Sequence, residues 1–121
     1  MEKCIYVVED NANIREIIEF LLVEELYKVK VYPNVATFWI EMNQHYPDLI
    51  VLDVMLPDGN GLDICAKLKS DAKTHDIPVM MMSANNYLRD VKSHCSAEDF
   101  INKPFDLNDF VNRVEHYAPH N

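Results

Sequence analysis

Four polar sites in the sequence each stand at the end of a short apolar run. The runs end at Glu9 and Asp10, at Asp53, at Ser83 and at Lys103. Short continuous apolar runs are typical of buried parallel strands. The carboxyl ends of such strands share one edge of the sheet, where open α/β folds bind ligands. We therefore expect three carboxylates, a hydroxyl and an ammonium to converge in one pocket.

The chemistry of this pocket follows from its charges. Three carboxylates repel one another, and Lys103 alone cannot neutralise them, so the cluster is stable when it binds a cation. Hard oxygen ligands on a shallow edge suit Mg²⁺ with several retained waters, which leaves room for a phosphoryl group. Asp53 is then placed to be the nucleophile that forms an acyl phosphate, while Lys103 and Ser83 contact the anion.

Each of these residues has a simpler interpretation when it is taken alone. An acidic pair at a strand end is often a helix cap or a solvated turn, and Asp53 alone could equally be a turn aspartate. Ser83 alone is usually a helix N-cap, and Lys103 alone is usually a surface lysine. The joint occurrence at the ends of successive strands is what favours the pocket.

The elements that position these residues alternate between strand and helix signals. Strands are predicted at about 4–9, 28–32, 48–53, 78–83 and 99–102. Apolar residues at helical spacing predict helices between them, with inward residues that include Ile17, Phe38, Trp39, Leu88, Val91 and Leu107. The pattern predicts an α/β fold, an open doubly wound parallel sheet in the order 2-1-3-4-5 flanked by five helices. The cluster 57–61 predicts a turn.

Composition narrows the class of protein. The 121 residues, 49% of them hydrophobic, predict a single domain over 1–121 with its own core. A net charge of −9 does not provide the basic face that nucleic-acid binding requires. Three cysteines without a C-x-x-C pair predict reduced thiols. Without an apolar leader or a membrane-length apolar stretch, we expect a soluble cytoplasmic domain that does not enter a membrane.

The most specific motifs lie in five stretches: Tyr6–Asn11, Pro47–Pro57, Asn60–Gly61, Ile77–Ala84 and Phe100–Phe105. Together they resemble the receiver domain of two-component response regulators, and the resemblance covers nearly the whole chain. It implies a phosphorylation-activated signalling switch. The donor would be a phosphohistidine on a histidine kinase or a histidine phosphotransfer protein.

The resemblance also implies roles around the metal and the phosphoryl group. Asp53 matches the phosphoacceptor, Asp10 matches an acidic Mg²⁺ ligand, and Glu9 matches its neighbour, which acts directly or through water. Met55 matches the position whose backbone carbonyl completes the metal site. Lys103 matches the lysine that contacts a phosphoryl oxygen.

Three further roles concern the conformational switch and its output. Ser83 and Phe100 match the switch hydroxyl and the switch aromatic, and the bond before Pro104 matches a cis peptide bond. Signalling would leave through the segment from Ser83 to Lys103 and the last helix, which is also the expected homodimer face. Salt bridges there would involve Asp99, Lys92 and Arg113. We expect self-phosphorylation and autodephosphorylation, and no turnover of a separate substrate.

The sequence departs from the family pattern mainly between Ser83 and Lys103. This segment is about two residues shorter than usual, and Ser96 stands where the family usually has a glycine. Asn85 and Asn86 replace the start of a regular helix, so the fourth helix is expected to be short or shifted.

Two other functions fit these residues less well. A phosphatase of the haloacid dehalogenase type needs a second aspartate two residues after the nucleophile, and Met55 stands there. A pseudo-receiver that only docks partners would not need the acidic pocket. A dinucleotide site is not expected, because neither Gly59 nor Gly61 follows the first strand.

Overall fold

The structure is a computed structural model that describes residues 2–84 and 95–120. Its main sheet has five strands, β1 (Cys4–Val8), β2 (Lys28–Tyr32), β3 (Leu49–Asp53), β6 (Val79–Ala84) and β7 (Asp99–Lys103). They lie in the order β2-β1-β3-β6-β7, and every neighbouring pair is parallel. The predicted order 2-1-3-4-5 is confirmed, counting the strands of this sheet along the chain.

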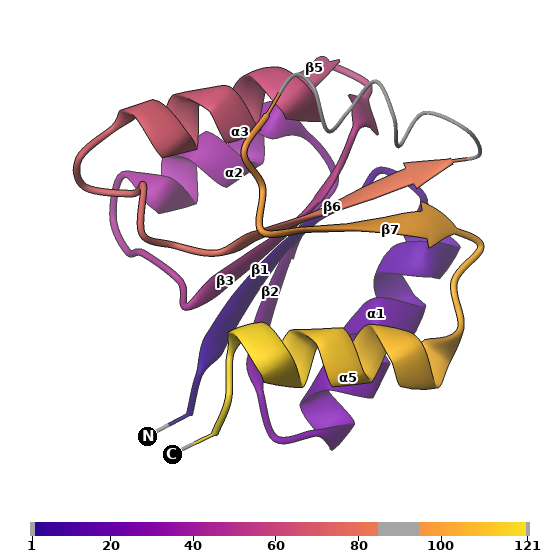
Figure 1. Cartoon of the computed structure of the whole chain (residues 1–121). Coiled ribbons are helices and arrows are strands. Elements are labelled where there is room, and N and C mark those ends of the chain that lie inside the picture. The colour runs from indigo at the N-terminus through magenta and orange to yellow at the C-terminus, as the bar shows by residue number, and fades with distance from the viewer. Residues whose placement is uncertain (1, 85–94, 121) are drawn as a thin grey trace.

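Four helices cover the sheet in the described residues: α1 (Ala12–Glu24), α2 (Val35–Met42), α3 (Gly61–Ser70) and α5 (Leu107–Tyr117). Figure 1 shows α2 and α3 on one face of the sheet and α1 and α5 on the other. Each helix begins after an Asn or Asp whose side chain accepts a backbone N–H of the first turn. The fourth predicted helix, which carries Leu88 and Val91, falls on 85–94, outside the described residues.

The sheet separates two apolar layers. One contains Phe38 with alternate residues of the strands, such as Leu52, and the other contains Phe110 with their neighbours, such as Val51. All of β3 is buried, as expected for a central parallel strand. This packing holds the carboxyl ends of the strands in a fixed register.

The prediction that Ile17 and Leu107 face the core is wrong. Ile17 is 47% exposed and Leu107 is 46% exposed. On α1 the buried face is carried by Ile18 and Leu22, and Ile17 lies just outside this face. On α5, Phe110 and Val114 fill the space against the sheet. No helix in the described parts of the chain is long and apolar enough to cross a membrane.

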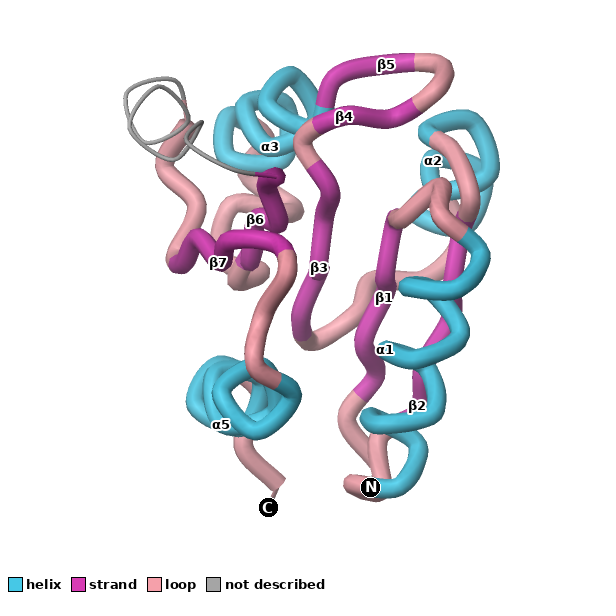
Figure 2. The backbone as a smooth tube through the Cα atoms, turned by 90° about the vertical axis from the view of Figure 1, so that its right-hand side faces the viewer, coloured by secondary structure: helices cyan, strands magenta, loops and turns pink. Residues whose placement is uncertain are grey.

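The predicted turn after β3 is a small antiparallel hairpin of β4 (Met55–Leu56) and β5 (Gly59–Asn60). Figure 2 shows this hairpin at the end of the molecule opposite the two termini. Asp58 at its tip accepts hydrogen bonds from the backbone N–H groups of Val35 and Ala36, at 2.8 and 3.1 Å. The hairpin is thereby fastened to the start of α2.

Gly61 fixes how closely the chain returns to β3 after the hairpin. Its N–H donates to the Val54 carbonyl at 2.7 Å. A Cβ at position 61 would lie 2.1 Å from the carbonyl oxygen of Asp53, so only glycine fits there. The backbone that carries Asp53 is therefore held directly against the first turn of α3.

Candidate functional site

Strand register brings the predicted site residues to one edge of the sheet. Asp53, the last residue of β3, pairs with Met82 on β6. The next residue of β6, Ser83, pairs with Asn102 on β7, and Lys103 follows it. Because the strands are parallel, all of these residues lie at the carboxyl ends.

Three carboxylates form the centre of the site. Oxygen atoms of Glu9, Asp10 and Asp53 all lie within 4.8 Å of one another. Glu9 is fully buried, Asp53 is 6% exposed, and Asp10 is exposed. Hard oxygens at this spacing fit a divalent cation, and the open side at Asp10 leaves room for its waters.

Lys103 is the counter-charge of this cluster in the described residues. Its ammonium forms ion pairs with Glu9 and with Asp53, the latter at 3.1 Å between Nζ and Oδ2. Burial lowers the pKa of Lys103, but the hydrogen bond to Glu9 and the charge of Asp53 outweigh this effect and raise it. Lys103 therefore stays charged at neutral pH.

Glu9 is the most buried carboxylate of the site, and this burial affects its pKa. Burial raises the pKa of Glu9, and the nearby charge of Asp53 acts in the same direction. The hydrogen bonds that Glu9 accepts from Lys103 and from the Asn11 N–H oppose this shift without cancelling it. The excess of negative charge is what a bound cation would relieve.

Arg15 is a contributor that sequence reasoning missed. Its Nη1 donates to the backbone carbonyls of Glu9 at 2.9 Å and of Asp10 at 3.2 Å. These bonds fix the turn that follows β1. A positive charge in the first turn of α1, where the helix dipole disfavours it, was the available signal.

The remaining predicted residues lie around this centre. Ser83 is buried, and its Oγ lies 3.5 Å from the Ala84 carbonyl oxygen. Met55 is on β4 and is 70% exposed, while the role of its carbonyl stays a prediction. Phe100 is half-buried against the core layer of α2 and α3. The Lys103–Pro104 bond is cis, as the resemblance implies.

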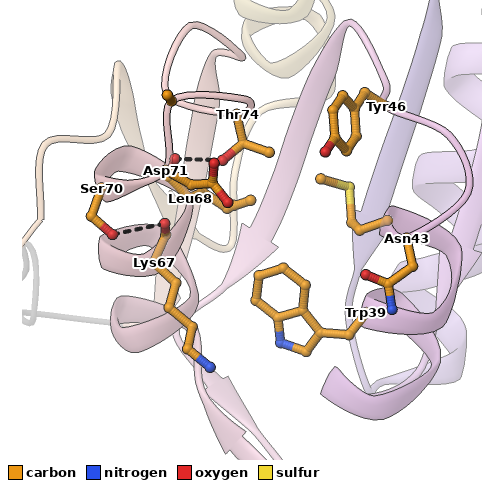
Figure 3. A pocket seen from close by; sticks show the side chains of 10 residues that line it. Trp39, Asn43, Tyr46, Lys67, Leu68, Ser70, Asp71 and Thr74 are labelled. Atoms are coloured by element: carbon orange, nitrogen blue, oxygen red, sulfur yellow. Dashed lines mark hydrogen bonds between the residues drawn. The ribbon is translucent and has the colours of Figure 1, made fainter.

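A separate groove of about 640 Å³ lies between α2 and α3. Figure 3 shows Trp39, Asn43 and Tyr46 along one side and Lys67 and Asp71 along the other. No residue of the acidic cluster lines it. Trp39 packs against the core, as the sequence predicts.

Comparison with known sequences gives one consistent match. The family model for the response regulator receiver domain matches residues 5–115. The phosphate regulon transcriptional regulatory protein PhoB of Klebsiella pneumoniae is 38% identical over 117 residues, which cover 95% of this chain and 51% of PhoB. The response regulator ArlR of Staphylococcus aureus is 34% identical, with 91% of this chain and 50% of ArlR covered. The chain thus spans about half the length of these curated relatives.

Solved structures agree with the sequence match. The receiver domain of a histidine kinase from Syntrophus aciditrophicus superposes with a TM-score of 0.88 at 28% identity, covering 95% of this chain and 89% of that one. The BeF3-activated DrrB receiver domain gives a TM-score of 0.85 at 27% identity, with 97% of each chain covered. On the family match, the sequence relatives and the shared fold, this chain belongs to the response regulator receiver domain family.

Proposed function

We propose that this chain is a phosphorylation switch in which Asp53 accepts a phosphoryl group from a phosphohistidine donor. The observation that carries the proposal is the cluster of Glu9, Asp10 and Asp53, whose oxygens lie within 4.8 Å and which Lys103 contacts. The donor would be a histidine kinase or a histidine phosphotransfer protein, and the domain would work in the cytoplasm. Its own contribution would be limited to self-phosphorylation and autodephosphorylation.

Mg²⁺ fits the donor set of this site. Glu9, Asp10 and Asp53 would hold it through carboxylate oxygens, Glu9 directly or through water, and the Met55 carbonyl would complete the set. When bound, Mg²⁺ offsets the negative charge that builds up between the carboxylates and the phosphoryl oxygens.

The protein groups then have separate tasks in the transfer. Lys103 contacts Oδ2 of Asp53, so we assign the attack on phosphorus to Oδ1. The O–P bond forms as the P–N bond to the donor imidazole breaks, and the bonding electron pair stays with the imidazole nitrogen. The Lys103 ammonium and the Ser83 hydroxyl would bind phosphoryl oxygens in the product.

The output would pass through β7 and α5. Ser83 and Phe100 would reorient when the phosphoryl group is present, which would bias the packing of this face. A homodimer through the same face would recruit Asp99 and Arg113, which pair within the chain at 3.1 Å. Lys92, the third residue assigned to that contact, lies outside the described residues. This domain would not itself contact DNA.

The direct test uses acetyl phosphate with Mg²⁺ and intact-mass measurement. We expect one phosphoryl adduct on the wild type and none on Asp53→Asn. Asp76→Asn, at a side chain that is 94% exposed, is the matched control and should be phosphorylated as the wild type is. An adduct that persists in Asp53→Asn would contradict the assignment.

Two outcomes would favour the other functions. Steady hydrolysis of a generic phosphoester such as p-nitrophenyl phosphate would indicate a phosphatase. A flat Mg²⁺ titration followed by the fluorescence of Trp39 and the tyrosines would indicate a docking module without a metal site.

A further inference from the structure

Arg15 reaches back from α1 to the turn that carries two of the three site carboxylates. Its Nη1 donates to the backbone carbonyl of Glu9 at 2.9 Å and to that of Asp10 at 3.2 Å. The backbone N–H of Arg15 donates to the Asn11 carbonyl at 3.0 Å, which is the first hydrogen bond of the helix. This one residue therefore connects α1 to three consecutive carbonyls of the turn after β1.

The two carboxylates of this turn are restrained to different degrees. Glu9 is fully buried, its Oε2 accepts the Asn11 N–H at 3.1 Å, and Lys103 contacts its Oε1. Asp10 is exposed, and its carboxylate forms no hydrogen bond or ion pair with the described residues. The bond from Arg15 to the Asp10 carbonyl is therefore the side-chain contact that holds Asp10 in place within the acidic cluster.

We propose that Arg15 is a positioning residue that makes the site select Mg²⁺ over Ca²⁺. The inference rests on the proposed function only in taking the acidic cluster as a Mg²⁺ site. Mg²⁺ demands near-ideal octahedral geometry with short bonds to oxygen, whereas Ca²⁺ accepts longer bonds and variable geometry. A turn whose carbonyls are held by a guanidinium keeps its carboxylates in one arrangement. Loosening this turn should therefore weaken the binding of Mg²⁺ more than that of Ca²⁺.

The positive charge of Arg15 does not by itself produce this selectivity. The guanidinium has no ion-pair partner in the described residues, so its charge acts on the neighbouring carboxylates and on any cation they bind. A positive charge disfavours a bound cation, but Mg²⁺ and Ca²⁺ carry the same charge, so both are affected nearly equally. The ratio of the two affinities therefore separates the geometric role of Arg15 from its electrostatic role.

The test measures the dissociation constants of Mg²⁺ and of Ca²⁺ for the unphosphorylated full chain. Each cation is titrated into the protein, and NMR follows the backbone amide signals of residues 9–11. Arg15→Met should weaken the binding of Mg²⁺ about tenfold, as the loss of a group that orients metal ligands does. The binding of Ca²⁺ should change several times less, so that the preference for Mg²⁺ falls. Urea unfolding without metal shows whether the variant is folded.

Two further variants separate the loss of charge from the loss of the hydrogen bonds. Lys73 is exposed in the loop that leads into the amino end of β6, and its side chain has no ion-pair partner in the described residues. Lys73→Met removes the same positive charge away from the acidic cluster and should keep the wild-type ratio of affinities. Arg15→Lys keeps the charge, but its side chain is one bond shorter. This variant should therefore bind Mg²⁺ with an affinity between those of the wild type and Arg15→Met.

Several results would overturn the proposal. They are a wild type that binds Ca²⁺ as tightly as Mg²⁺, a wild-type ratio of affinities or tighter binding of Mg²⁺ in Arg15→Met, and an equal fall of the ratio in Lys73→Met. If Arg15→Met does not fold, a wild-type ratio in Arg15→Lys has the same meaning. A wild type that does not bind Mg²⁺ would overturn this proposal together with the proposed metal site. A wild type that binds Mg²⁺ but accepts no phosphoryl group would contradict the proposed function alone.

Discussion

Lys103 Nζ lies 3.1 Å from Asp53 Oδ2, although 50 residues separate the two in sequence. The same ammonium also pairs with the buried Glu9. This contact exists because β3, β6 and β7 are parallel neighbours that end at the same edge. The ammonium of Lys103 therefore supplies part of the positive charge that the three carboxylates require.

Replacing Lys103 by Met should destabilise the metal-free protein and make its stability depend on Mg²⁺. Removing one partner of a buried ion pair costs roughly 3 kcal/mol, because the other charge stays buried. Mg²⁺ should restore more stability to Lys103→Met than to the wild type, since the ion replaces the lost charge. Urea unfolding with and without Mg²⁺ measures both effects.

The control for that variant is Lys67→Met. Lys67 is an exposed lysine that lies over the Trp39 ring, and it has no ion-pair partner in the described residues. The Lys67→Met variant should unfold at about the same urea concentration as the wild type, and Mg²⁺ should stabilise it as much as it stabilises the wild type. If Lys103→Met matches Lys67→Met in both measurements, Lys103 is not the counter-charge of the site.

Gly61→Ala should be much more damaging than Gly59→Ala. The added Cβ at position 61 would meet backbone, 2.1 Å from the Asp53 carbonyl oxygen, whereas at position 59 it would lie 2.9 Å from Cγ2 of Val35, a side-chain atom. Overpacking against rigid backbone costs about 1–3 kcal/mol. Chemical denaturation of the two variants measures their free energies of unfolding. Equal losses of stability would show that the backbone at Gly61 does not pack closely against the backbone of Asp53.

Asp58→Asn should lower the thermal stability at neutral pH, and the loss should shrink in acid. The hydrogen bonds from Val35 and Ala36 hold the pKa of Asp58 below its usual value, with the Val35 bond contributing most. A carboxyl whose folded pKa is lowered stabilises the fold above its unfolded pKa of about 3.9 and loses this effect as pH falls through the folded pKa.

The measurement for Asp58 is the difference in Tm between variant and wild type across that range of pH. Asp76→Asn, at an aspartate that does not cap a helix in the described residues, should show no comparable pH-dependent difference. If the Tm difference between Asp58→Asn and the wild type stays constant from pH 7 to strongly acidic pH, the negative charge of Asp58 does not stabilise the fold.

The strand ends and the acidic pocket were predictable because they depend on local patterns. The apolar run before Asp53 predicts a buried strand. Parallel strands place their carboxyl ends at one edge of the sheet regardless of the conformation of the loops between them. The roles of Asp58 and Arg15 were not predictable in the same way. Asp58 caps a helix that starts 23 residues earlier, and a turn motif does not reveal such a contact. Leu107 has apolar chemistry and helical spacing, yet Phe110 and Val114 already fill the space beside the sheet.

The central claim is that Asp53 is the residue that carries the phosphoryl group. The most direct measurement is reduction with borohydride after treatment with acetyl phosphate and Mg²⁺, because this reagent converts an aspartyl phosphate into homoserine. Peptide mass spectrometry should then find homoserine at position 53 and not at Asp10, and the signal should vanish when Mg²⁺ is removed by a chelator. An unmodified Asp53 in protein that nevertheless carries a phosphoryl group would contradict the account.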